Sequence, residues 1–201
     1  FDQIETEIDV LTMRSDLAPL PASRDEVLAL EDVYESDAMV YLSEECTESN
    51  FKRVAPNYGI LHIASHGLVD DYSPLYSSIA FTKENSEDGF LEVREIFNMV
   101  LNADLAVLSA CKTGTGHSLN GEGILGLTRA FFTAGVPSVV SSLWNVADVS
   151  TRDLMIEFHT YLRDGERPAI ALQKAQIYLI HNTPYDSPIF WAPFKLSGDS
   201  E

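Results

Sequence analysis

Two apolar runs that each end in a reactive residue constrain the fold of this chain most. Residues 61–65 (Leu-His-Ile-Ala-Ser) lead to His66 and Gly67, and residues 107–110 (Val-Leu-Ser-Ala) lead to Cys111. Nearly every residue of the two runs is apolar or small, as in strands that are covered on both faces. We therefore predict an α/β fold, in which a mostly parallel sheet has helices packed on each side.

Helix-like and strand-like patterns alternate along the rest of the chain. Apolar spacing, with glycine and proline at the ends, predicts helices at 23–34, 122–134 and 150–165 and a further helix from Pro168. Capping boxes are predicted at 23–26 and 150–153. Strand character is found at 39–43, 59–65, 78–82, 104–110, 136–143 and 190–196.

Composition limits the class of protein. The chain has 201 residues, 45% of them apolar, enough for one substantial core. Its net charge of −18 disfavours nucleic acid and anionic membrane surfaces and favours a basic partner. No apolar run reaches the roughly 18 residues of a membrane span, and the start at Phe1 lacks the basic residues of a signal peptide. We expect a cytoplasmic fragment of a longer protein, with Cys46 and Cys111 as free thiols.

The ends of the two runs suggest nucleophilic catalysis. In an open parallel sheet, active groups collect beyond the carboxyl ends of the strands, and neighbouring strands lie about 4.8 Å apart. His66 and Cys111 can therefore meet as a base and a thiol nucleophile. The backbone N–H groups of Gly67 and Cys111 can form an oxyanion hole. We predict neither a cofactor nor a metal.

Two other motifs are weaker. His62 and His66 are four positions apart, but no third zinc ligand is apparent, and we interpret His62 as a core or supporting residue. Residues 121–126 match the dinucleotide pattern G-x-G-x-x-G, but a loop at 112–121 separates them from the preceding strand. These glycines are expected to permit close helix packing.

Several ordered motifs together resemble one family. They are His66-Gly67, Ser109-Ala110-Cys111 with Thr113, Gly114 and Gly116, GEGILGLTRAF at 121–131, SLWNVAD at 142–148 and WAPFKLSGD at 191–199. This set is similar to the CHAT domain, a caspase-related module often joined to tetratricopeptide repeats. The resemblance covers residues 22–199, with 1–21 as an N-terminal extension or partial first element. It implies a caspase-like α/β/α sandwich, His66 and Cys111 as a catalytic dyad and Gly67 as the oxyanion glycine.

The resemblance implies a cysteine endopeptidase. Ser109 stands where caspases carry glutamine, and the stretch 143–148 resembles separase, in which an aspartate binds an arginine side chain before the cleaved bond. We therefore hypothesise that Asp148, Ser109 and Trp144 bind substrate, with Asp148 recognising a basic residue. Asp148 can equally cap the helix near residue 150, and Trp144 can wall a groove or fill the core.

The resemblance also suggests partners. These are a protein or peptide substrate and a sensor or tetratricopeptide-repeat region in the same or a partner chain. The loops 83–89 and 112–120 are either regulatory segments or ordinary solvated loops. The alternative function is a catalytically silent CHAT-like scaffold that mediates protein–protein interaction.

Overall fold

The main sheet has four strands. The computed structural model describes residues 17, 19–70, 72–109 and 122–199. Three strands run parallel, and the last, on the edge, runs antiparallel to its neighbour. Their order across the sheet is β1 (Ile60–Ile63), β5 (Leu105–Leu108), β6 (Ser138–Ser142) and β7 (Phe194–Gly198). In register, Ile63 lies opposite Leu108 and Leu108 opposite Ser141, so the parallel strands end together.

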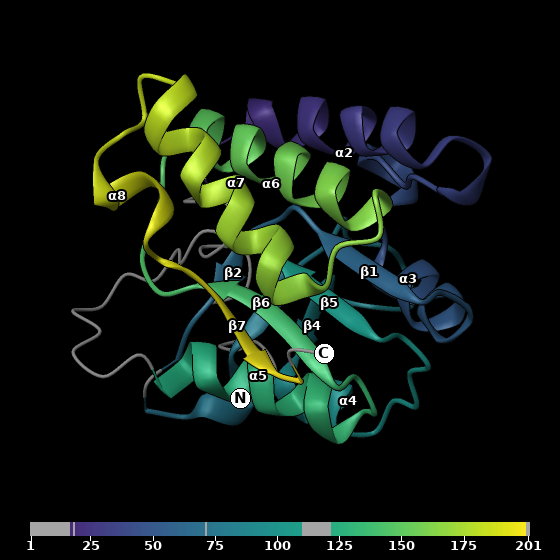
Figure 1. Cartoon of the computed structure of the whole chain (residues 1–201). Helices are drawn as coiled ribbons and strands as arrows, with labels where there is room; N and C mark the ends of the chain where they lie inside the picture. The colour runs from purple at the N-terminus through teal and green to yellow at the C-terminus, as the bar shows by residue number, and fades with distance from the viewer. Residues whose placement is uncertain (1–16, 18, 71, 110–121, 200–201) are drawn as a thin grey trace.

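Helices cover both faces of this sheet (Figure 1). One face carries α2 (Pro21–Tyr34), α6 (Asp148–Arg163) and α7 (Pro168–Asn182). The other carries α4 (Val93–Ile96) and α5 (Glu122–Thr133). The remaining helical segments are α3 (Glu48–Val54), α8 (Pro188–Trp191), η1 (Glu35–Asp37), η2 (Ser43–Glu45), η3 (Ala55–Asn57) and η4 (Pro74–Tyr76). The predicted α/β fold with a mostly parallel sheet between helical layers is confirmed.

The two-residue period of the strands divides the core. On β5, Ala106 and Leu108 pack in a cluster with Phe131 of α5. The alternate residues Leu105 and Val107 pack in a second cluster, which includes side chains of α6 and α7. All four strand residues are buried because both faces of the sheet are covered.

A small antiparallel sheet continues from the end of β1. Its strands are β2 (Gly67–Leu68), β3 (Ser78–Ala80) and β4 (Phe90–Glu92), with β3 in the middle. The backbone N–H of Ala80 donates to the carbonyl of His66 at 2.9 Å. The chain therefore passes from the main sheet into the small one at His66.

Most predicted elements are found, with shifted ends. The helices α5, α6 and α7 match the expected segments, and Gly135 and Gly165 follow two of them with positive φ values of 112° and 89°. The strand predicted at 39–43 is wrong: these residues make no strand pairing, and Ser43 begins η2. A short apolar run does not by itself make a strand, because a strand forms only where its backbone groups pair with those of a neighbour.

The capping boxes are also wrong. Both helices begin two residues earlier than predicted, and the hydroxyls of Ser23 and Ser150 donate to the carbonyls of Leu20 and Ala147 instead of accepting a helical N–H. The Glu26 carboxylate therefore takes no part in a helix cap. It is buried and contacts His62 instead. No helix in the described part of the chain has the length and apolar character needed to cross a membrane.

Candidate active site

Two neighbouring strands lead to the residues of the predicted dyad. The strands β1 and β5 are adjacent and parallel, and the N–H of Ser109 donates to the carbonyl of Ile63 at 3.0 Å. In sequence, His66 comes three positions after Ile63 (66 − 63) and Cys111 three positions after Leu108 (111 − 108). Cys111 itself lies outside the described residues. The structure therefore sets the strand that leads to Cys111, and the pairing of Cys111 with His66 stays a prediction.

The backbone around His66 is fixed by β3. His66 is half-buried, and its carbonyl bonds to Ala80 while the Ser65 hydroxyl donates to the Ala80 carbonyl. Gly67 is opposite Ile79, one position beyond the hydrogen-bonded pair of His66 and Ala80. Because such pairs alternate in an antiparallel ladder, the Gly67 N–H is directed away from β3. Gly67 also lines a small cavity of about 20 Å³ at the ends of β5 and β6.

Ser109 is buried and bonded to α2. Its side chain is 5% exposed, and its hydroxyl donates to Glu26 Oε1 at 2.6 Å. On β5 the odd-numbered residues face the layer of α2, α6 and α7, and Ser109 continues that alternation. The hydroxyl therefore anchors the end of β5 to α2, and substrate binding by Ser109 stays a prediction.

Asp148 caps a helix, although not the predicted one. It is the first residue of α6, is half-buried, and its Oδ2 accepts the backbone N–H of Ala22 at 2.6 Å. Ala22 lies in the first turn of α2, where backbone N–H groups have no partner within the helix. Asp148 thus joins the N-termini of α2 and α6. Recognition of a basic residue by Asp148 is not tested by this geometry.

Trp144 lies at the surface. The residue is 39% exposed, and its Nε1–H donates to the Ile189 carbonyl at 3.1 Å. The indole therefore packs against the α8 segment and is not a core filler. A role of the exposed indole as a wall of a substrate groove stays a prediction.

A buried polar chain that sequence reasoning missed joins α2, β1 and α6. Glu26 Oε1 lies 2.7 Å from His62 Nε2, His62 Nδ1 lies 3.0 Å from His159 Nε2, and His159 Nδ1 lies 3.0 Å from the hydroxyl of Tyr34. Glu26 and His159 are each 1% exposed. The interpretation of His62 as a supporting residue fits this position, since its two ring nitrogens contact Glu26 and His159.

Burial sets the protonation of this chain. It lowers the pKa of His159 well below its usual range, and the neighbouring His62 acts in the same direction. It raises the pKa of Tyr34 to about 12, against the opposing charge of Arg163. His159 is therefore a neutral imidazole and Tyr34 a neutral phenol at neutral pH. In the sequence, Glu26 belongs to a predicted capping box, and His62 and His159 are histidines within apolar segments, so nothing local indicated that the three connect.

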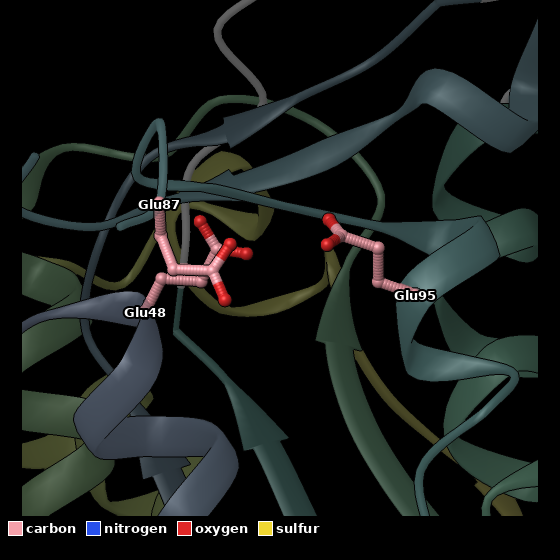
Figure 2. A group of neighbouring side chains, drawn as sticks. All are labelled: Glu48, Glu87 and Glu95. Carbon is pink, nitrogen blue, oxygen red and sulfur yellow. The ribbon is translucent and has the colours of Figure 1, made fainter. Parts of the chain in front are cut away.

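A second charged cluster surrounds Lys52. Figure 2 shows the carboxylates of Glu48, Glu87 and Glu95 gathered together. The ammonium group of Lys52 lies 2.7, 3.0 and 2.9 Å from them, respectively. Although desolvation opposes the charge, these hydrogen bonds raise the pKa of Lys52 well above its ordinary value. A divalent cation would have to displace the lysine, so we assign the cluster to stability.

An open groove adjoins these elements. A groove of about 660 Å³ lies between α2, the 38–47 segment and β1, whose only strand partner among the described residues is β5.

At α5, a Cβ atom on Gly126 would lie 3.6 Å from the Pro74 carbonyl and 3.8 Å from Val93. The close approach of this glycine to η4 and α4 supports its interpretation as a packing residue.

The sheet order, the two helical layers and a histidine just beyond a parallel strand define an α/β protein with a caspase-like fold. A family model described as CHAT domain matches residues 6–199, and the chain belongs to the CHAT domain family. The match begins within the stretch 1–21; the predicted division at residue 22 stays a prediction.

Two curated relatives carry the same kind of sequence. The chain is 28% identical over 108 residues, 54% of its length, to tetratricopeptide repeat protein 28 of Mus musculus, and likewise to the protein of that name in Homo sapiens. The aligned region spans only 4% of each relative. The association of this kind of domain with tetratricopeptide-repeat proteins is thus supported, whereas the activity of those large proteins says little about this chain.

Proposed function

We propose that this chain is a cysteine endopeptidase domain in which Cys111 is the nucleophile and His66 transfers protons. The observation that carries the proposal is the pairing of β1 with β5, which brings the carboxyl ends of the two strands side by side. Membership of a caspase-like family supports peptide hydrolysis as the reaction. We further propose a cytoplasmic location and regulation by a tetratricopeptide-repeat or sensor region in the same or a partner chain.

The proposed reaction has two steps. The Cys111 thiolate attacks the scissile carbonyl carbon, the C–N bond breaks, and His66 gives its proton to the leaving amine. Water then attacks the thioester carbon while His66 accepts its proton, and the C–S bond breaks. The product acid loses its proton to solvent, and the Cys111 thiolate and the protonated His66 are restored. The N–H groups of Gly67 and Cys111 stabilise the oxyanion, a role that agrees with a Gly67 N–H directed away from β3.

The proposed substrate has a basic residue before the cleaved bond. A carboxylate gives charge-assisted hydrogen bonds to a guanidinium group, and Asp148 lies in the segment after β6, whose end adjoins that of β5. Trp144 is exposed in the same segment and would form one wall of a substrate groove beside Asp148. Peptides with Arg or Lys at this position should be cleaved faster than a matched Asp peptide. Equal or faster cleavage after Asp would refute this preference without affecting the peptidase proposal.

Selective labelling of one thiol tests the peptidase proposal. A thiol-reactive peptide probe should label Cys111 and not Cys46, because burial raises the pKa of the Cys46 thiol. Labelling should persist in Cys46→Ala and be lost in Cys111→Ala and strongly reduced in His66→Ala. New N-termini in neighbouring proteins that depend on Cys111 would identify substrates. Labelling that does not depend on His66 would contradict the proposal.

A silent scaffold is the second candidate. The names of the two relatives refer to tetratricopeptide repeats and not to a peptidase. A scaffold predicts that Cys111 reacts as an ordinary thiol and that partner binding survives Cys111→Ala. The probe experiment therefore separates the two candidates.

A further inference from the structure

We infer that Glu26 is a positioning residue for the Cys111–His66 dyad, because one of its oxygens joins the strand that leads to His66 with the strand that leads to Cys111. This inference rests on the proposed function and adds to it a residue outside the family motifs. Glu26 Oε1 lies 2.7 Å from His62 Nε2 and 2.6 Å from the hydroxyl of Ser109. His62 lies on β1 four positions before His66, and Ser109 follows β5 two positions before Cys111.

The shared oxygen constrains both strand ends at once. Glu26 is 1% exposed and Ser109 5% exposed, so water cannot replace either contact without opening the layer between α2 and the sheet. Ser109 is held a second time, since its backbone N–H donates to the Ile63 carbonyl of β1. The last described residue before the nucleophile segment is thus fixed through both its side chain and its backbone.

The contacts of Glu26 continue into the buried polar chain. The Ser109 hydroxyl donates to Glu26 Oε1, and His62 Nε2 lies at hydrogen-bond distance from the same oxygen. His62 Nδ1 pairs in turn with His159 Nε2, and His159 Nδ1 pairs with the Tyr34 hydroxyl. The lowered pKa of His159 keeps that ring uncharged, so its two nitrogens serve as one donor and one acceptor.

Helix α2 carries the carboxylate and is itself held at both ends. Asp148 accepts the Ala22 N–H at its N-terminus, and Tyr34 contacts His159 near its C-terminus. The position of Glu26 is therefore set by α6, which packs along α2. Glu26 takes no part in capping α2, so capping does not explain why its carboxylate is buried.

The variant Glu26→Gln tests the inference. Glutamine has nearly the shape of glutamate but no charge. Its amide presents either an NH₂ group or one carbonyl oxygen to His62 and Ser109. On a Cys46→Ala background, we would measure the rate of Cys111 alkylation by iodoacetamide between about pH 5 and about pH 9. Glu26→Gln and Ser109→Ala should each lower the His66-dependent rate at neutral pH about tenfold or more, the effect of losing a charge-assisted hydrogen bond. The midpoint of the pH profile should move toward that of an ordinary thiol.

A control from the same chain separates positioning from general stability. His159→Gln disturbs the buried polar chain but leaves the contacts of Glu26 Oε1 with both strands in place. Its alkylation profile should match the wild type when samples of equal folded fraction are compared. If Glu26→Gln fails to fold, Ser109→Ala decides alone, because it keeps the contact between Glu26 and His62.

The failures are distinguishable. A wild-type profile for Glu26→Gln, in a protein whose reactivity is lost in His66→Ala, overturns the positioning role and leaves the proposed peptidase standing. If wild type and His66→Ala both react as ordinary thiols, there is no dyad, and the proposed function and the positioning role fall together. An equal loss in His159→Gln would also overturn the inference, since it would assign the effect to the stability of the buried chain.

Discussion

Exchanging His159 for glutamine should change how the free energy of unfolding depends on pH. In the unfolded chain the imidazole titrates with a pKa of about 6.5, whereas in the folded protein burial holds the pKa of His159 well below that value. Below about pH 6.5 the unfolded state therefore binds one proton that the folded state does not. The neutral, buried His159 therefore does not reduce the free energy of unfolding above the unfolded pKa, and it reduces this free energy progressively as the pH falls below that value.

The magnitude follows from proton linkage. A difference of one bound proton changes the free energy of unfolding by about 1.4 kcal/mol per pH unit, so about 2 kcal/mol is lost between about pH 7.5 and about pH 5. At neutral pH, His159→Gln should be less stable than wild type by about 1 kcal/mol, because the Tyr34 hydroxyl loses its hydrogen-bond partner. The two stabilities should therefore meet or cross on acidification.

Urea denaturation at a series of pH values measures this difference. Other groups titrate in both proteins, so the quantity of interest is the gap between wild type and His159→Gln at each pH. His181→Gln, an exchange at an exposed position of α7, serves as the matched control for removing a histidine. A gap that stays constant from neutral to acidic pH would refute the reasoning, since His159 would then titrate alike in the folded and unfolded states.

Three further predictions concern stability. Lys52→Met should lower the free energy of unfolding by about 3 kcal/mol in urea titrations, because it leaves three carboxylates unpaired, one of them buried; a loss below about 1 kcal/mol would contradict this. Asp148→Ala should cost about 1 kcal/mol in thermal melts through loss of the α2 cap, with Asp148→Asn milder; equal losses would argue against capping. Gly198→Ala should destabilise far more than Gly165→Ala, since both have positive φ but only at Gly198 would a Cβ meet a backbone carbonyl, at 2.1 Å.

The strands that lead to the candidate site could be predicted because their signals are local. A strand that is covered on both faces is apolar at nearly every position. Four or five residues suffice to show this pattern, as in the runs before His66 and Cys111. Helix ends at Gly165 and Pro168 are marked by residues whose backbone preferences are intrinsic. The strand pairing of β1 with β5 then follows from the rule that sequential parallel strands joined by a crossover lie close together.

The roles of the polar residues could not be predicted in the same way. Glu26 fits a capping box in sequence, and only packing shows that its carboxylate meets β1 and β5 instead. Ser109 occupies the position of a substrate residue in a related family, yet the alternation of β5 turns its hydroxyl toward α2. Asp148 lies where a cap was expected, but its partner is in another helix.

The sequence by itself determined the α/β class, the helices α5, α6 and α7, and the strands that carry the candidate dyad. Each of these depends on periodicity or backbone preference within a single segment, so neighbouring residues suffice to specify it. Only the tertiary structure decided what Glu26, Ser109 and Asp148 do, because their hydrogen-bond partners lie 36 to 126 positions away in the chain. A polar side chain is satisfied by whatever donor or acceptor folding brings to it, and no local pattern records which one that will be.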